Sequence, residues 1–249
     1  MVSWQTRMES VVRSALVDKV DRDHTETDRA FLRRRIVVGI VLVVGATLLG
    51  ISLSVKPGDP LFYTLTIALA LVWIVGGFLS GPLHLGRIPF RGHLRRPILT
   101  PIAIGLAAGA VFVLGALIVR EIPPLRDFTA NVLDHARVGP FALIVFITLF
   151  NGLAEEIFFR GALFAAIGRG RPVLISTIVY TIATLATGNP MLGFAAITLG
   201  FVLGLERRAS GGILAPILTH VSWSTVMVFA MPPLFACTHP GRRWTPSTR

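Results

Sequence analysis

The chain carries little charge for its length. Asp, Glu, Lys and Arg make up 15% of its 249 residues, whereas soluble globular domains carry about 25%. Together with a hydrophobic content of 53%, this shortage excludes an ordinary soluble domain. Cysteine is nearly absent as well. Cys237 is the single cysteine, so an intrachain disulfide is excluded.

Acidic residues are also scarce, with 13 Asp and Glu against 24 Lys and Arg and a formal net charge of +11. An excess of this size is typical of proteins that bind nucleic acid or a membrane surface. Here the arginines cluster in short segments beside long apolar runs, which is how topology signals are distributed in membrane proteins. We therefore predict the lipid bilayer as a partner and no nucleic-acid partner.

Long apolar runs dominate the sequence. Several approach or exceed the roughly 20 residues that an α-helix needs to cross a bilayer. The runs are continuous rather than alternating, which argues against a transmembrane β-barrel. The predicted fold class is all-α: a polytopic integral membrane protein with seven or eight transmembrane helices. The expected spans are residues 36–55, 61–79, 98–119, 139–167, 173–187, 191–205 and 213–236.

This segmentation divides the chain into four regions. They are a polar N-terminal tail (1–35), three spans with their loops (36–138), a four-helix core (139–236) and a basic C-terminal tail (237–249). Part of the N-terminal tail is expected to be helical, because its apolar residues recur at helical spacing. Residues 80–97 are expected to form a loop.

Small residues and prolines add expectations about packing and helix ends. Gly105-x-x-x-Gly109 forms a small-residue surface that favours close contact with another helix. Pro123-Pro124 is expected to mark the end of a helix. Met231-Pro232-Pro233 is expected to break the last span.

The positive-inside rule orients the spans. With the N-terminus in the cytoplasm, every arginine-rich segment up to the last span falls on the cytoplasmic side, and the other loops are uncharged or balanced in charge. The predicted location is a cell membrane, which is the plasma membrane in a bacterium. With seven spans, the C-terminal tail and its three arginines fall on the non-cytoplasmic side. The tail lies on the cytoplasmic side only if the residues after the prolines re-enter the membrane or if there is an eighth span.

One apolar run carries a costly cluster of charges. Glu155, Glu156 and Arg160 are the only Asp, Glu, Lys or Arg residues that this segmentation places inside a span. At roughly 3 kcal/mol each they cost about 9 kcal/mol, which about fifteen flanking apolar residues at roughly 0.5 kcal/mol each only just offset. The helix therefore needs neighbouring helices or water around the cluster, and charges of this kind indicate a functional site.

Two further polar residues fall at a similar depth. At 1.5 Å per residue, Glu155 and Glu156 lie roughly 17 Å from the cytoplasmic end of their span, His220 roughly 14 Å and Thr184 roughly 17 Å. His220 is also the only histidine inside a predicted span. Two carboxylates, an imidazole and a hydroxyl are therefore expected to converge at one level.

The two carboxylates are expected to differ in role. Glu156 and Arg160 are four residues apart, so they share a helix face in the favourable order of acid then base. We expect Arg160 to hold Glu156 ionised. Glu155 is rotated about 100° away and is expected to be free to act as a general base for water, near His220. The alternative is a buried ion pair that only specifies helix packing.

Residues 139–235 resemble the four-helix core of the CPBP (CAAX protease and bacteriocin-processing) or Abi family of intramembrane proteases, also called type II CAAX prenyl endopeptidase-like proteins. The first family motif, Glu-Glu-x-x-x-Arg, is matched in the sequence A-E-E-I-F-F-R-G-A-L-F by Glu155, Glu156 and Arg160.

The other two family motifs match in part. In the second, an aromatic-x-x-x-His, Tyr180 fits the aromatic position and Thr184 stands where the histidine belongs. In the third, His-x-x-x-Asn or Asp, His220 fits and Ser224 replaces the Asn or Asp. The sequence G-G-I-L-A-P-I-L-T-H that leads to His220 also resembles the family.

The resemblance implies an intramembrane endopeptidase with the catalytic residues Glu155, Glu156, Arg160 and His220. Glu155 inherits the role of the base that activates water, and Arg160 inherits a structural role. His220 inherits either a metal-binding role or an oxyanion-stabilising role. The implied cofactor is zinc or another divalent metal held by Glu155 and His220, or the site is metal-free. The implied substrate cavity is formed by Tyr180, Thr184 and Ser224.

Two classes of function therefore compete. In the first, the protein is an endopeptidase that hydrolyses a peptide bond of a membrane-associated or lipidated peptide. In the second, Thr184 and Ser224, which replace the His and the Asn or Asp of the family motifs, impair catalysis. The protein is then a membrane scaffold, an assembly factor or an immunity-type protein that binds such a peptide. A third interpretation, a proton-linked transporter, also suits buried Glu and His, but no pair of interrupted spans in matching halves supports it.

Overall fold

The computed structural model describes residues 4–20, 25–90 and 93–236, with side chains from residue 8 onward. Six helical segments within these residues are long and apolar enough to cross a membrane. The prediction of a polytopic, all-helical membrane protein is thus confirmed. The six segments are α2 (Asp28–Ser54), α3 (Pro60–Ser80), α4 (Leu99–Val119), the continuous segment Phe141–Ile167, α9 (Pro190–Ser210) and α10 (Leu214–Ala236).

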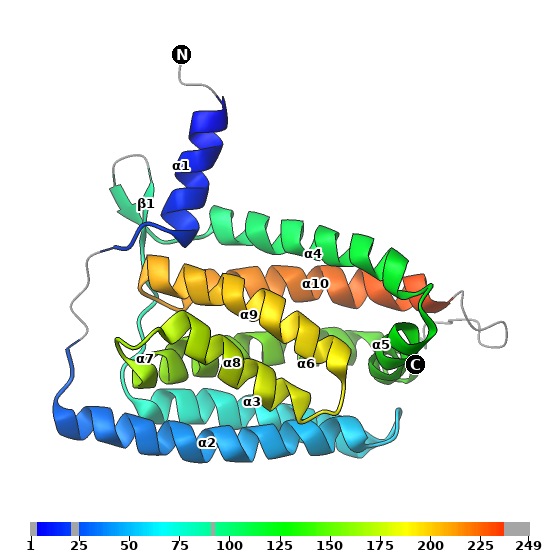
Figure 1. Cartoon of the computed structure of the whole chain (residues 1–249). Helices are drawn as coiled ribbons and strands as arrows, with labels where there is room; N and C mark the ends of the chain where they lie inside the picture. Colours follow the sequence, from blue (N-terminus) through cyan, green and yellow to red (C-terminus); the bar gives the residue numbers. More distant parts are fainter. Residues whose placement is uncertain (1–3, 21–24, 91–92, 237–249) are drawn as a thin grey trace.

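The seventh predicted span, residues 173–187, corresponds to a shorter helix. This helix, α8 (Pro172–Leu185), has 14 residues, which extend about 21 Å at 1.5 Å per residue. The hydrocarbon layer of a bilayer is about 30 Å thick. α8 packs alongside α9 inside the bundle (Figure 1), and its length is shorter than the hydrocarbon layer.

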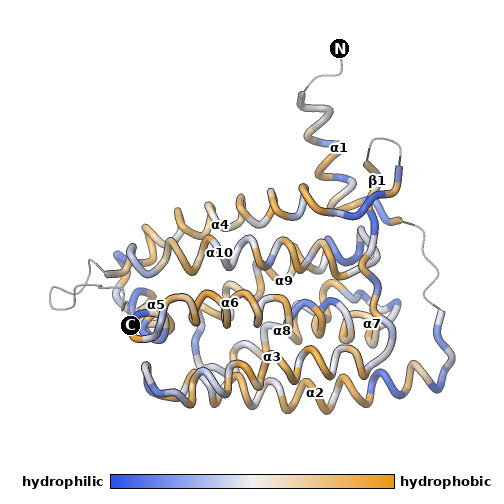
Figure 2. Tube along the Cα trace, turned by 180° about the vertical axis from the view of Figure 1, so that it is seen from behind, coloured by the Kyte–Doolittle hydropathy of each residue, from blue (hydrophilic) through white to orange (hydrophobic). Residues whose placement is uncertain are grey.

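The long helices run side by side along one axis (Figure 1). α2 and α3 form a pair on one side of the bundle, and α4 and α10 form a pair on the opposite side. The segment Phe141–Ile167 lies between the two pairs and contacts both α3 and α10. Hydrophobic residues cover long stretches of the outer helices, and hydrophilic residues gather mainly near the helix ends (Figure 2). The segment with the costly charges is therefore shielded from lipid by its neighbours.

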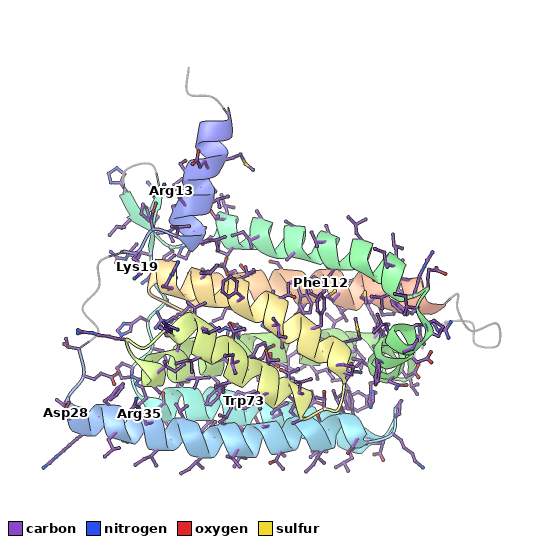
Figure 3. All side chains as sticks on the ribbon, viewed as in Figure 1. Arg13, Lys19, Asp28, Arg35, Trp73 and Phe112 are labelled. Atoms are coloured by element: carbon purple, nitrogen blue, oxygen red, sulfur yellow. The ribbon has the colours of Figure 1, made fainter. Side chains whose placement is uncertain are left out.

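Glycines allow the paired helices to approach closely. A side chain at Gly105 would collide with the backbone of Thr219, and one at Gly109 would collide with a side chain of α10. The small-residue surface predicted on α4 is therefore a helix–helix contact. Gly45 has the same effect between α2 and α3, where it faces the fully buried ring of Trp73 about halfway along the helices (Figure 3).

One of the two predictions about prolines is wrong. α4 ends at Val119, shortly before Pro123 and Pro124 as expected, and these two prolines also begin α5 (Pro123–Val138). A proline suits the first helical position because the N–H that it lacks has no intrahelical partner there. Pro232 and Pro233 lie inside α10, which continues to Ala236. Packed neighbours in a membrane bundle tolerate such prolines by satisfying the freed backbone groups.

Residues 80–97 contain more structure than the predicted loop. β1 (Ile88–Phe90) and β2 (His93–Arg95) pair as a two-stranded antiparallel hairpin. The stretch before the hairpin is bound to the start of α10, because Ile213 N–H donates to the His84 carbonyl at 2.9 Å. The connection between α3 and α4 is therefore fixed to the bundle end instead of being free in solvent.

The N-terminal tail is largely helical. α1 (Trp4–Leu16) stands at one end of the bundle, roughly perpendicular to the long helices, and projects away from them while contacting α9 (Figure 1). α2 begins at Asp28 and not at the predicted residue 36, because Thr27 caps it by accepting a hydrogen bond from Ala30 N–H at 3.3 Å. The C-terminal tail (237–249), with Cys237, lies outside the residues that the structure describes.

Arg34 lies in the first part of α2 and is buried, with 1% of its surface exposed. Its guanidinium pairs with Glu26 and donates to Ser80 Oγ and to the Pro82 carbonyl, both at 3.3 Å. Neighbouring Arg33 is exposed. Arg34 therefore joins the start of α2 to the end of α3.

We expect Arg34→Met to lower the free energy of unfolding by about 3 kcal/mol, because it leaves the partly buried Glu26 without its partner. Arg33→Met, which removes an exposed charge from the adjacent position, is expected to change it by less than about 0.5 kcal/mol. Thermal unfolding of both variants in detergent measures the difference. Equal losses in the two variants would contradict a joining role for Arg34.

Candidate active site

The charged stretch lies where an α-helix widens into a π-helix. α6 (Phe141–Glu155) ends at Glu155, and the π-helix η1 (Glu156–Leu163) then continues into α7 (Phe164–Ile167). π-helical turns are rare and occur often at functional sites. Every residue of η1 is buried, so its charged side chains face other helices and not lipid.

Glu156 and Arg160 form a fully buried ion pair. Arg160 Nη1 lies 3.0 Å from Glu156 Oε1, and both side chains are 0% exposed. Arg160 Nη2 donates to the Gly200 carbonyl of α9 at 3.2 Å, and its guanidinium carbon lies 4.6 Å from the centre of the Tyr180 ring. The predicted contact between Glu156 and Arg160 is therefore present, and Arg160 extends it to α8 and α9.

His220 of α10 binds the same carboxylate. Its Nδ1 lies 2.8 Å from Glu156 Oε1, the oxygen that Arg160 also contacts. Sequence reasoning linked His220 with Glu155, but the hydrogen bond of the imidazole goes to Glu156. The reason is the rotation between consecutive helical residues, which directs Glu156 toward α10 and Glu155 toward α8.

Glu155 is held by a tyrosine. The Tyr180 hydroxyl donates to Glu155 Oε2 at 2.6 Å, and the Tyr180 ring packs 4.7 Å from the ring of Phe159 between centres. The expectation that Glu155 is free is therefore wrong. The part of the chain that the structure describes forms no hydrogen bond to the other oxygen, Oε1, and the residue is only half-buried. One carboxylate oxygen is thus anchored and the other remains available.

Ser224 lies beside His220, and Gly152 of α6 leaves room for both. A Cβ atom at Gly152 would be 3.5 Å from Ser224 Oγ and 3.6 Å from His220 Nε2. The Ser224 side chain is buried with 3% exposed. The hydroxyl of Ser224 and the second imidazole nitrogen therefore border the same space next to α6.

Thr184 does not join this cluster by a hydrogen bond. Its hydroxyl donates to the Tyr180 carbonyl at 2.9 Å, one turn earlier in its own helix. The structure thus connects the motif residues Glu155, Glu156, Arg160, Tyr180 and His220, and brings Ser224 next to them. The Thr184 hydroxyl donates its one hydrogen to the backbone of α8 and not to the cluster.

Sequence reasoning missed two buried ionisable residues at the end of α9. Glu206 and Arg207 are 0% and 5% exposed, whereas the predicted span ended at residue 205. Together with Arg34 they correct the expectation that the spans contain only three charged residues. Arg207 Nε donates to the Arg160 carbonyl at 2.6 Å, so it supports η1. The left-handed Gly211 (φ 73°) after the last turn is a common helix-end signal and identifies the true boundary.

The donor groups do not fit a zinc ion held by the protein alone. Protein zinc sites use three or four N, O or S ligands. The described residues contain no group of three or more His, Cys, Asp or Glu placed to hold a metal ion. Of the two ligands expected from the sequence, Glu155 is bound by Tyr180 and His220 by Glu156. The described residues therefore do not supply the ligand set of a zinc site.

We expect Arg160→Met to destabilise the protein by about 3–5 kcal/mol, because it leaves the carboxylate of Glu156 buried with one partner fewer. Arg169→Met is the matched control, since Arg169 follows the same helical segment but is exposed. Thermal unfolding in detergent compares the two variants with the wild type. A stable Arg160→Met protein would show that the pair contributes little to folding.

Residues 137–226 match a protein-family model described as type II CAAX prenyl endopeptidase Rce1-like. This match spans α6, η1, α8 and α9 and ends inside α10, so it includes every residue of the buried cluster described above. No curated protein and no solved structure matches the chain. Residues 137–226 of this integral membrane protein therefore form a domain of the Rce1-like, type II CAAX prenyl endopeptidase family.

Proposed function

We propose that the protein is an intramembrane endopeptidase that hydrolyses a peptide bond of a membrane-associated or lipidated peptide. The observation that carries this proposal is the arrangement of the two adjacent glutamates. Glu156 is neutralised by Arg160 and bonded to His220, whereas Glu155 is anchored through one oxygen only. One carboxylate is thus committed to structure, and the other is available for proton transfer.

Glu155 is the general base in this proposal. The Tyr180 hydroxyl fixes Oε2, which leaves Oε1 to take a proton from water as the water oxygen attacks the scissile carbonyl carbon. The resulting tetrahedral intermediate then loses its C–N bond, and Glu155 returns the proton to the leaving amine. The products are a carboxylic acid and an amine, so one water molecule is consumed and Glu155 is regenerated.

His220 stabilises the negative charge on the carbonyl oxygen. Its Nδ1 faces Glu156, so Nε2 is the nitrogen that remains for the substrate. The imidazolium form is the one that donates from both nitrogens, to Glu156 and to the developing oxyanion. A preformed donor of this kind is most effective in a site from which water is excluded.

Ser224 takes the second position at the oxyanion. Its hydroxyl lies beside His220 Nε2 in the space next to Gly152, and a hydroxyl donates a hydrogen bond as an amide does. Thr184, which replaces the family histidine, has no part in water activation here because its hydroxyl is bonded to its own helix. The orienting contact to Glu155 comes from Tyr180 instead.

The cleavage site faces the cytoplasmic half of the membrane in this proposal, in a cell membrane with the N-terminus in the cytoplasm. Arg13, Lys19 and Arg35 all lie at one end of the bundle (Figure 3). Basic residues next to spans mark the cytoplasmic side. A peptide that enters from that end, with Tyr180 and Ser224 lining its path, approaches the bundle interior where Glu155 lies.

The competing function is a membrane scaffold, an assembly factor or an immunity-type protein that binds the same class of peptide without cleaving it. The observation that favours it is the local hydrogen bond of Thr184, which removes one hydroxyl from the site. The two functions differ in the fate of the bound peptide, so a cleavage assay separates them.

We expect wild-type protein in liposomes to cleave members of a library of membrane peptides, and Glu155→Gln to lower the rate by about 100-fold or more, because it removes the base. Tyr180→Phe should lower it by about tenfold, since Glu155 then loses its anchor. Glu121→Gln, an exposed control, should leave the rate unchanged. A Glu155→Gln enzyme as active as the wild type would contradict the mechanism. A silent wild type that gains activity on Thr184→His would favour the scaffold.

A second comparison addresses Ser224. Ser224→Ala should lower kcat by about 10- to 100-fold, because one oxyanion donor is lost, while Ser224→Asn should retain most of the activity through its amide N–H. Mass spectrometry of the products of both variants measures the rates. Equal loss in the two variants would mean that the hydroxyl itself is required, which the proposal does not allow.

A further inference from the structure

A third carboxylate, close to the two of the site, is buried without a cationic partner. Glu206, in the last turn of α9, is 0% exposed. Its Oε1 lies 2.8 Å from Thr219 Oγ1, and its Oε2 has no hydrogen-bond partner. Among the residues that the structure describes, no Lys, Arg or His side chain forms an ion pair with it.

An ionised carboxylate is unfavourable in this environment. A charge that is removed from water and left unpaired costs far more than a neutral polar group in the same place. The charged residues of η1, Glu156 and Arg160, are already paired with each other. The adjacent Arg207 directs its Nε to the Arg160 carbonyl. Protonation removes the charge on Glu206 without any change in structure.

The number of hydrogen atoms available for the two hydrogen bonds of Thr219 also indicates that Glu206 is protonated. Thr219 Oγ1 lies 2.8 Å from Glu206 Oε1 and 3.0 Å from the Pro101 carbonyl oxygen of α4. A threonine hydroxyl has one hydrogen and donates to one acceptor at a time. Both short contacts are hydrogen bonds only if a second hydrogen is present. The carboxyl group of Glu206 is the one group of the three that is able to supply it.

We propose that Glu206 is held as a neutral carboxylic acid that donates a hydrogen bond to Thr219, while Thr219 donates to the Pro101 carbonyl. These two consecutive hydrogen bonds position His220. α9, α10 and α4 are then joined at Thr219, the residue immediately before His220. The contact is tight, because Gly105 of α4 has no room for a side chain against the Thr219 backbone. Glu206 is thus a positioning residue that acts through α10.

Only one part of this inference rests on the proposed function. The effect of Glu206 on peptide cleavage requires that His220 takes part in catalysis. The protonation of Glu206 and its effect on the His220 ring are properties of the folded protein. They are measurable whether or not the protein cleaves a peptide.

The protonation is tested by infrared spectroscopy of the full chain in liposomes. A protonated carboxyl group gives a carbonyl stretching band that a carboxylate lacks. We expect such a band in the wild type, its loss in Glu206→Gln, and its retention in the control Glu121→Gln, which changes an exposed glutamate. Unchanged spectra in Glu206→Gln would overturn the proposal.

The positioning role is tested with three variants at two residues. Glu206→Gln keeps a neutral hydrogen-bond donor of the same shape. Glu206→Leu and Thr219→Val instead remove one of the side chains that form the two consecutive hydrogen bonds. Solid-state ¹⁵N spectra of histidine-labelled protein, with the His220 signals assigned by their loss in His220→Asn, report on the ring. We expect wild-type His220 signals and an unchanged unfolding temperature in Glu206→Gln, and altered signals in the other two variants.

Cleavage assays on the same samples separate the possible failures. If the wild type cleaves peptides, kcat should stay within about threefold in Glu206→Gln and fall by up to about 100-fold in Glu206→Leu. His220 signals that are altered as much in Glu206→Gln as in Glu206→Leu would overturn the neutral-donor proposal. A wild type without cleavage, but with the expected infrared and ¹⁵N results, would contradict only the proposed function.

Discussion

At the centre of this protein, one oxygen of the Glu156 carboxylate links η1 to α10. Glu156 Oε1 lies 3.0 Å from Arg160 Nη1 and 2.8 Å from His220 Nδ1, in a place with no exposure to solvent. A carboxylate in so apolar an environment requires partners, because its lost hydration must be replaced. These contacts fix the position of α10 relative to η1. The arrangement of the remaining polar groups then depends on this register.

Local features of the surrounding helices allow Arg160 and His220 to contact the carboxylate of Glu156. The π-helical widening of η1 begins at Glu156 itself, and Gly152 one turn earlier leaves room for the His220 ring. Gly200 of α9 presents its carbonyl to Arg160 at 3.2 Å. A Cβ atom at Gly200 would lie 3.2 Å from Arg160 Nη2, so the guanidinium would have to shift, whereas one at Gly152 would only touch the His220 ring at 3.4 Å. Gly200 therefore makes room for the charged partner of Glu156 as well as allowing close packing.

Much of the architecture could be predicted from the sequence, because long apolar runs are a strong signal that depends on no tertiary contact. The pairing of Glu156 with Arg160 was also predictable, since a spacing of four residues on one helix determines it. The partner of His220 was not, because contacts between helices depend on rotations that no single segment encodes. The sequence pointed to a free Glu155 for the same reason: the hydroxyl that binds it belongs to Tyr180, on another helix.

The buried charges outside the main motif were harder to predict. Hydropathy separates apolar runs from charged ends, so Glu206 and Arg207 were assigned to a loop although α9 continues through them to Ser210. Arg34 was placed in the polar N-terminal tail, yet it lies in α2 and is buried, unlike the two arginines beside it. Prolines 123 and 124 are compatible with either end of a helix. In each case the outcome depends on which neighbouring backbone or side chain is within reach.

The position of His220 depends on its contact with Glu156, and a double-mutant cycle measures this dependence. Unfolding free energies of the wild type, Glu156→Gln, His220→Gln and the double variant give the coupling between the two side chains. We expect a coupling of about 1.5 kcal/mol or more, in the upper part of the range of about 0.5–3 kcal/mol for side chains in contact. A coupling below about 0.5 kcal/mol would show that the two residues act independently and that Glu156 does not hold His220 in place.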